Sequence, residues 1–201
     1  GVLQALTSKG DLILADKLNH ASLIDGARLS QADSLRYPHC DLKALEKRLS
    51  RSSQNTFVVT DSVFSMDGDI APLDEIAALC EKHNAVLIVD DAHGFGVIGK
   101  NGRGASELFD LDQNRLPVLI TTLGKALGGY GAIVSGKNEL VDYLMQSARN
   151  YIYTTSLPAS VASGNLANLD IISGSNELIK ALKNNTNYFK ALCEKSEIKL
   201  V

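Results

Sequence analysis

One lysine lies in a loop whose composition suits a covalent cofactor. Lys125 belongs to "TTLGKALGGYG" (residues 121–131), where two threonines precede it and four glycines surround or follow it. A lysine amine at the end of a buried strand is partly kept from water, which favours the neutral form that attacks an aldehyde to form a Schiff base. Hydroxyl groups and the free backbone N–H groups of a glycine-rich loop bind phosphate. The loop therefore predicts a site for a phosphate-bearing aldehyde.

An aspartate and a histidine follow a second apolar run. In "VDDAHG" (residues 89–94), Asp90 and His93 are three positions apart, so that a carboxylate and an imidazole can reach one ligand. Two alternatives remain open: Asp90 or Asp91 caps the following turn, or a metal binds there with Asp61, Asp67 and Asp69. The ligand spacing H-x-x-x-H is missing, which disfavours the metal. A carboxylate for a ring nitrogen, an amine for an aldehyde and donors for a phosphate together describe pyridoxal 5'-phosphate (PLP).

The elements that would position these residues alternate along the chain. Apolar runs and amphipathic segments exchange roughly every 10 to 15 residues, a pattern typical of an α/β protein with a mostly parallel sheet covered by helices. Residues such as "AVLIVD" (85–90) are continuously apolar, which predicts a strand covered on both faces. The predicted strands are 12–15, 34–37, 56–60, 85–90, 117–122 and 131–136, and the predicted helices are 20–30, 41–50, 72–83, 138–152, 158–172 and 176–195.

In such a sheet the functional residues gather beyond the carboxyl ends of the strands. Three polar clusters fall at such ends: "TDSVFSMDGD" (60–69), "DDAHGFG" (90–96) and "TTLGK" (121–125). We therefore expect these clusters to meet at one edge of the sheet.

Composition narrows the class of protein. The chain has 201 residues, begins with Gly1 and ends in "SEIKLV", and we expect it to be a piece of a longer protein. The net charge of −3 gives no electrostatic footprint for nucleic acid, and no apolar run reaches the roughly 20 residues that a membrane span needs. The three cysteines are far apart and form no C-x-x-C pair, which predicts reduced, buried thiols and a cytoplasmic protein. We expect one large domain over 1–174, and over 175–201 the beginning of a helix that leads into a second domain.

Five motifs in this order and spacing resemble one enzyme family. They are "NHASLIDGARLS", "SVFSMDGDIAPL", "VDDAHGFGVIGKNGRG", "TTLGKALGGYGA" and "ARNYIYTTSLP". Together they are similar to the large domain of the α-oxoamine synthases, PLP enzymes of fold-type I that condense an amino acid with an acyl thioester. The resemblance covers nearly the whole chain and implies a three-layer α-β-α fold of the aspartate aminotransferase type. The chain departs from the family's usual "HND" at Cys40, within Pro38–Asp41.

The resemblance implies three catalytic residues. Lys125 would hold PLP as a Schiff base and later move the substrate α-proton. Asp90 would pair with the pyridine nitrogen and keep it protonated, because an adjacent carboxylate favours the charged form of a cation. His20 would stack on the face of the ring.

The resemblance also implies the remaining cofactor contacts. Ser65 and His93 would bond the phenolic oxygen side of the ring, and Thr122 would bind the phosphate. Tyr151–Ser160, taken alone, is typical of a surface loop. In the family, however, the matching segment crosses to the neighbouring subunit, which implies a homodimer in which Thr154 and Thr155 reach the partner's phosphate site.

The expected substrates are inferred only from the similarity of two sequence segments to particular members of the family. "LNHASLIDGARLS" followed by "RYPHCDLKALEKRL" looks most like the members that act in biotin biosynthesis, which implies L-alanine and a pimeloyl thioester. Glycine C-acetyltransferase, serine palmitoyltransferase and 5-aminolevulinate synthase share much of the same pattern. A non-catalytic α/β domain is an alternative of a different class.

Overall fold

A six-stranded sheet forms the centre of the protein. The computed structural model describes residues 1–51, 53–174 and 176–200. The strands lie in the order β2-β1-β3-β4-β5-β6; the first five are parallel, and β6 is antiparallel to β5. The strands are β1 (Leu12–Asp16), β2 (Asp33–Tyr37), β3 (Thr56–Asp61), β4 (Val86–Asp90), β5 (Val118–Thr122) and β6 (Ala132–Ser135).

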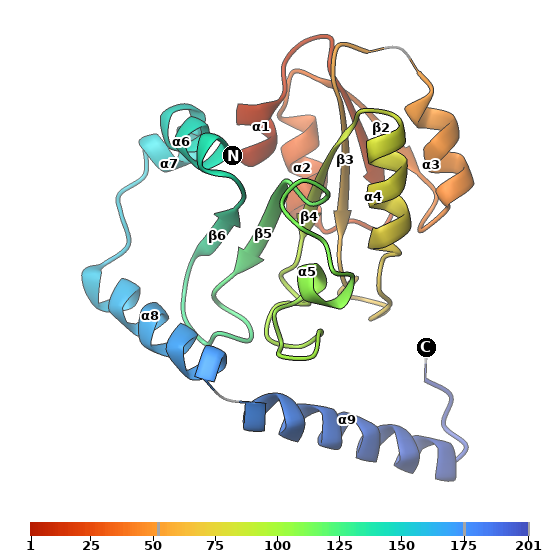
Figure 1. Ribbon diagram of the computed structural model, residues 1–201, viewed down its shortest axis with the longest axis vertical. Helices are drawn as coiled ribbons and strands as arrows, with labels where there is room; N and C mark the ends of the chain where they lie inside the picture. The colour runs from red at the N-terminus through yellow and green to blue at the C-terminus, as the bar shows by residue number, and fades with distance from the viewer. Residues whose placement is uncertain (52, 175, 201) are drawn as a thin grey trace.

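Helices cover both faces of this sheet. They are α1 (Val2–Leu6), α2 (Ala21–Arg28), α3 (Leu42–Leu49), α4 (Leu73–Lys82), α5 (Ala105–Leu108), α6 (Asn138–Ser147), α7 (Arg149–Ile152), α8 (Ala159–Gly174) and α9 (Asn176–Lys195). α3 and α4 lie on one side of the sheet, and α1 and α2 on the other (Figure 1). The predicted three-layer α-β-α architecture with a mostly parallel sheet is confirmed.

Two apolar clusters hold the layers together. Leu45 of α3 and Ile76 of α4 pack on one face of the sheet against Leu14 and Val58, and Leu23 of α2 packs on the other face. All residues of β3 are buried, as expected for a strand covered on both faces. The predicted cap of α3 is also present, because the Asp41 carboxylate accepts a hydrogen bond from the Ala44 N–H at 2.9 Å.

The single helix predicted over 138–152 is wrong. The structure has two helices there, because Ala148 adopts an extended conformation (φ −75°, ψ 102°) between α6 and α7. Ala148 is buried, and Asn150 and Tyr151 beyond it line a cavity against the sheet. The buried residue at the break is Ala148 itself, and the segment contains no helix-breaking proline or glycine.

The last two helices depart from this arrangement. α8 and α9 lie beyond the carboxyl ends of the parallel strands and cover neither face of the sheet (Figure 1). α9 contacts the rest of the protein through Ile179, near Gly102, and through Lys183, whose Nζ donates to the Gly99 carbonyl at 3.0 Å. The expected domain boundary falls at residue 175, outside the described residues. Among the residues that the structure describes, no helix has the length and apolar character needed to cross a membrane.

Candidate active site

The carboxyl ends of three neighbouring strands bring the polar clusters together. Asp61 at the end of β3 is paired in register with Asp90 at the end of β4, and Asp90 is paired with Ile120 of β5. The chain continues this pairing beyond the strands, because Ser62 N donates to the Asp90 carbonyl at 2.9 Å and Asp91 N to the Ile120 carbonyl at 2.7 Å. Parallel strands in this order place all three ends at one edge of the sheet.

Lys125 and His93 are in direct contact. Lys125 Nζ lies 2.6 Å from His93 Nε2. Burial and the positive charge of Lys125 lower the pKa of His93, so that the imidazole is a neutral acceptor for the lysine ammonium at neutral pH. The lysine is exposed, three residues beyond β5, so the expectation that the end of the strand shields it from water is wrong for this chain.

Backbone hydrogen bonds shape the loop that carries Lys125. Leu123 N donates to the Gly131 carbonyl, and Gly129 N donates to the Leu123 carbonyl, so that the loop closes on itself. Gly128, whose N–H donates to the Lys125 carbonyl, has a φ of +70° that favours glycine. The glycines of this loop therefore set its path around the lysine.

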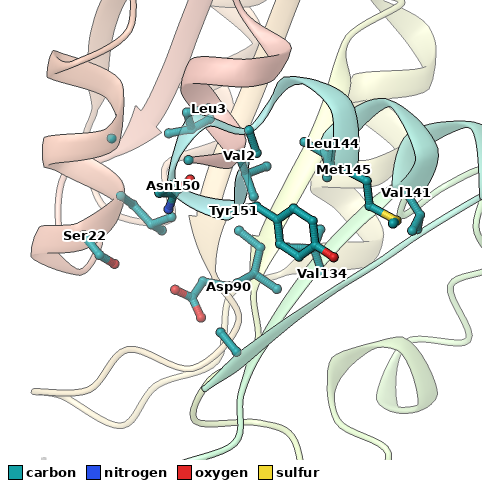
Figure 2. Close-up of a pocket in the computed structure, with 16 residues that line it drawn as sticks. Val2, Leu3, Ser22, Asp90, Val134, Val141, Leu144, Met145, Asn150 and Tyr151 are labelled. Carbon is teal, nitrogen blue, oxygen red and sulfur yellow. The ribbon is translucent and has the colours of Figure 1, made fainter. Parts of the chain in front are cut away.

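Asp90 faces a cavity of about 480 Å³ between the sheet and the helices α1, α2 and α6. Figure 2 shows Asp90, Ser22 and Tyr151 around this cavity, whose other walls are mainly apolar side chains such as Val134 and Met145. One oxygen of Asp90 also accepts a hydrogen bond from Ala92 N at 3.0 Å, so the predicted capping alternative is part of its role. A carboxylate at an apolar wall suits a ring that carries a protonated nitrogen.

His20 reaches the same edge from the start of α2. Its backbone N–H donates to Asp61 Oδ2 at 2.7 Å. Its Nδ1 accepts a hydrogen bond from Ser22 N at 3.2 Å, which places the ring proton of a neutral imidazole on Nε2. The charges of His20, Asp90 and Lys125 all act on the pKa of His93, so these four residues form one electrostatic cluster.

The whole chain, residues 1–201, matches the family model described as aminotransferase class I and II. The chain belongs to this family. An 8-amino-7-oxononanoate synthase from Marinobacter nauticus is 54% identical over 88% of this chain and 45% of its own length. The solved structure of an 8-amino-7-oxononanoate synthase from Francisella tularensis covers the entire chain with a TM-score of 0.87 and 40% identity, over 58% of its own length.

A second similar solved structure carries PLP. This serine palmitoyltransferase from S. paucimobilis, solved with a bound PLP-myriocin aldimine, is 33% identical over 92% of this chain and 48% of its own, with a TM-score of 0.87. The chain spans about half the length of the curated relatives that it matches. The predicted relationship to the α-oxoamine synthases is confirmed by these matches.

Asp61 and Asp91 were considered above only as a metal ligand and a turn cap, and their supporting roles in the site were not predicted. Burial raises the pKa of both Asp61 and Asp91 to about 6, and the negative charge of Asp90 contributes in each case. Asp91 accepts hydrogen bonds from Ser62 Oγ and from Ala105 N, which tie together the segments after β3 and β4 and the start of α5. Asp61 accepts a hydrogen bond from the backbone N–H of His20. Both acids therefore fix the backbone segments that carry the cluster residues.

None of the remaining predicted residues has a side-chain hydrogen bond to this cluster among the described residues. The Thr122 hydroxyl donates to the Gly131 carbonyl at 3.3 Å, which fixes it to the Lys125 loop. Ser65 is exposed in the hairpin that follows β3. Thr154 and Thr155 are exposed in the connection between α7 and α8, which runs along the outer side of β6 (Figure 1).

The alternative of a metal at Asp90 and His93 finds no support in the contacts. His93 Nε2 faces the Lys125 ammonium rather than a ring of carboxylates. Among the described residues, one group has His, Cys and carboxylate atoms within 4.8 Å of one another, and it consists of Asp16, His39 and Cys40 near the ends of β1 and β2.

Proposed function

We propose that this chain is the cofactor-binding part of a longer PLP-dependent acyltransferase, called the full-length enzyme below. The proposed reaction joins the α-carbon of L-alanine to the carbonyl carbon of a pimeloyl thioester. The alanine carboxyl group leaves as CO₂, the thiol of the carrier leaves from the acyl group, and 8-amino-7-oxononanoate is formed for biotin biosynthesis. The carrying observation is the contact between Lys125 and neutral His93 beside Asp90, in a chain 54% identical to an 8-amino-7-oxononanoate synthase.

The residues present fit PLP by the chemistry of their side chains. PLP, when bound, supplies an aldehyde for an amine and a ring that accepts electrons from a carbanion. Lys125 offers the amine, and Asp90 offers a negative charge at the cavity wall for the ring nitrogen. His20 and Ser65 would contact the ring, and the loop hydroxyl of Thr122 would contact the phosphate, as the family resemblance implies.

The chain's own residues would also move the proton. His93 Nε2 accepts a hydrogen bond from Lys125 and is kept neutral by burial and by the lysine charge. It can therefore hold the Lys125 amine in place by accepting its hydrogen bond. We assign the neutral amine of Lys125 as the base that removes the substrate α-proton. His93 would also contact the phenolic oxygen side of the PLP ring.

Other members of the family are the nearest alternatives. The serine palmitoyltransferase structure has the same TM-score, 0.87, as the 8-amino-7-oxononanoate synthase structure, so the fold alone does not separate the substrates. The sequence identity of 40% against 33% favours the pimeloyl reaction. Turnover of the full-length enzyme with L-alanine, glycine and L-serine, each with pimeloyl, acetyl and palmitoyl thioesters, decides among these, glycine C-acetyltransferase included.

Addition of PLP to the full-length enzyme is expected to produce a visible absorption band. Reduction with borohydride should then fix the cofactor covalently, and peptide mapping should find it on Lys125, because a Schiff base becomes a stable amine on reduction. A non-catalytic α/β domain would give neither the band nor the labelled peptide.

We further propose the division and assembly of the full-length enzyme. Residues 1–174 would form the PLP-binding domain, and residues 175–201 would begin the helix that leads into a smaller domain. Within the described residues α8 has no buried side chain, although it is rich in apolar residues such as Leu166 and Ile171. Large apolar side chains on a helix are normally covered, and we infer that a second subunit of a cytoplasmic homodimer contributes to covering α8.

Mixed dimers test the shared site. Lys125→Ala subunits and Thr154→Ala/Thr155→Ala subunits are each expected to be inactive alone. If Thr154 and Thr155 reach the partner's phosphate site, a mixed dimer collects both defects in one site and leaves the other intact. Recovery of about half the wild-type activity per mixed dimer is expected by this symmetry. Subunit exchange without recovered activity would contradict the crossing segment.

A further inference from the structure

His39, two residues after β2, contacts two carboxylates from different parts of the chain. Its Nδ1 lies 3.0 Å from Asp16 Oδ1, at the end of β1, and its Nε2 lies 2.7 Å from Asp69 Oδ2, in the segment after β3. The Asp16 side chain is 1% exposed. A neutral imidazole carries one N–H group, so both contacts are hydrogen bonds only when His39 is protonated.

The Asp16–His39–Asp69 contacts, called the bridge below, include on one side the turn that precedes His20. Asp16 Oδ1, the oxygen bound by His39, also accepts from Leu18 N at 2.8 Å, and the Asp16 carbonyl accepts from Asn19 N at 3.3 Å. These bonds define residues 16–20, the His20 turn. Asp16 therefore fixes the backbone that leads directly into His20.

On the other side the bridge holds the hairpin that carries Ser65. Residues 62–71, the Ser65 hairpin, are closed by pairing of Val63 with Ile70 and by the bond from Phe64 N to the Asp69 carbonyl at 3.0 Å. The Phe64 ring also meets the His39 ring edge-on, with centroids 4.3 Å apart and planes at 88°. His39 thus contacts both the residue before Ser65 and the acid that closes its hairpin.

We propose that the His39 imidazolium is a positioning residue that couples the His20 turn to the Ser65 hairpin. The inference rests on the proposed function, in which His20 and Ser65 contact PLP from these two segments. Each segment has its own anchor at the strand ends, because His20 N donates to Asp61 Oδ2 and Ser62 N, at the start of the hairpin, donates to the Asp90 carbonyl. His39 adds a side-chain link between the two segments themselves, through Asp16 on one side and Asp69 on the other.

A metal is the competing use of Asp16, His39 and Cys40. Both nitrogens of His39 and both oxygens of Asp16 already have hydrogen-bond partners, including Cys40 N at 2.9 Å from Asp16 Oδ2. Burial, with the charges of Asp16 and Asp69, raises the pKa of the Cys40 thiol to about 12 and disfavours the thiolate that binds metals. The hydrogen-bonded bridge accounts for the arrangement without a metal.

The bridge makes the coupling depend on pH. Burial alone lowers the pKa of His39, but the hydrogen bonds and charges of Asp16 and Asp69 outweigh it, and the pKa is raised above its ordinary value. Among the described residues, the Cys40 thiol, with its Sγ 3.7 Å from His39 Nε2, is a third titratable group beside the ring. A raised pKa in the folded state gives stability that is complete below the unfolded value of about 6.5 and is lost as pH rises through the folded pKa.

Hydrogen exchange of the full-length enzyme without PLP tests the coupling directly. In His39→Gln, amides of both the His20 turn and the Ser65 hairpin are expected to exchange faster than in wild type, about tenfold for a coupling of ordinary size. His83→Gln, at a partly buried histidine at the end of α4 and near Glu46 of α3, is the matched control and should change neither segment. Faster exchange in only one of the two segments would overturn the coupling.

The pH profile of PLP binding provides the second readout. The affinity of wild type and of His83→Gln is expected to fall by about tenfold as pH rises through the His39 pKa, and His39→Gln should lack this step. Asp69→Asn keeps an acceptor for Nε2 but removes one charge, so the midpoint of the step should move to lower pH. Identical profiles in wild type and His39→Gln would overturn the proposal. A wild type that gives no PLP band would contradict the proposed function instead, while the exchange experiment still decides the coupling.

Discussion

Replacement of Lys125 by alanine is expected to lower turnover of the full-length enzyme by more than about 10³-fold, because it removes both the covalent anchor and the base. Free PLP should still absorb, but borohydride should leave no cofactor attached to the protein. The variant should fold, since the Lys125 side chain is exposed and its contact is with His93. The steady-state rate, together with mass spectrometry of the reduced protein, measures both effects.

A second lysine provides the control for this prediction. Lys137 is exposed at the start of α6, and Lys137→Ala should keep the covalent label and the rate. Lys125→Ala should also release His93 from a neighbouring positive charge, so the pKa of His93 should rise, although burial, the larger cause of its lowered pKa, remains. Covalent labelling that persists in Lys125→Ala would show that another amine holds the cofactor.

The architecture could be predicted from local patterns. Continuous apolar runs such as Val86–Asp90 can satisfy both faces of a covered strand, and Asp41 before an amphipathic run can cap a helix. These preferences act over a few residues and are visible in the sequence. The break at Ala148 could not be predicted in this way, because it depends on packing against the distant sheet and N-terminal residues.

The sequence predicts which residues lie at the strand ends, but it does not predict which way their side chains face or which partners they contact. Asp90 and Asp91 are neighbours of the same type, yet the pleat of β4 turns Asp90 to the cavity and Asp91 into a fully buried site between Ser62 and Ala105. Nothing local separates two adjacent aspartates before their partners are known. The support of His20 by Asp61, 41 positions away, is a long-range contact of the same kind.

Two glycines leave space for the buried carboxylate of Asp91. A Cβ on Gly94 would clash with Asp91 Oδ1, and one on Gly104 would clash with Asp91 Oδ2. Asp91 therefore occupies the space that a larger residue at either position would need. The sequence shows these glycines and Asp91, but it does not show that the Asp91 carboxylate lies against both of them.

Asp90→Asn is expected to leave PLP bound to Lys125 while slowing removal of the substrate α-proton by about 10² to 10⁴-fold. Asparagine can still accept the hydrogen bond that Ala92 N donates, so the turn after β4 should be preserved. It carries no charge, however, and a neutral partner does not keep a ring nitrogen protonated. Exchange of the α-hydrogen of L-alanine with solvent deuterium measures this step apart from the acyl transfer.

The neighbouring aspartate gives a matched control for Asp90→Asn. Asp91→Asn removes one of two acceptors used by Ser62 Oγ and Ala105 N, so it should lower the free energy of unfolding by about 1 to 3 kcal/mol. Folded Asp91→Asn enzyme should retain α-hydrogen exchange within about tenfold of wild type, since a loss of packing support alone does not remove the charge at the cavity.

Asp90→Asn should also lower the pKa of Asp61 and of Asp91, because the Asp90 charge, after burial, helps to raise both. That change is measurable without PLP by the carboxyl carbon shifts. The assignment of Asp90 would be contradicted if Asp90→Asn lowered the pKa of Asp61 but exchanged the α-hydrogen of L-alanine at the wild-type rate. The negative charge would then have been removed without slowing removal of the α-proton, and another residue would have to contact the ring nitrogen of PLP.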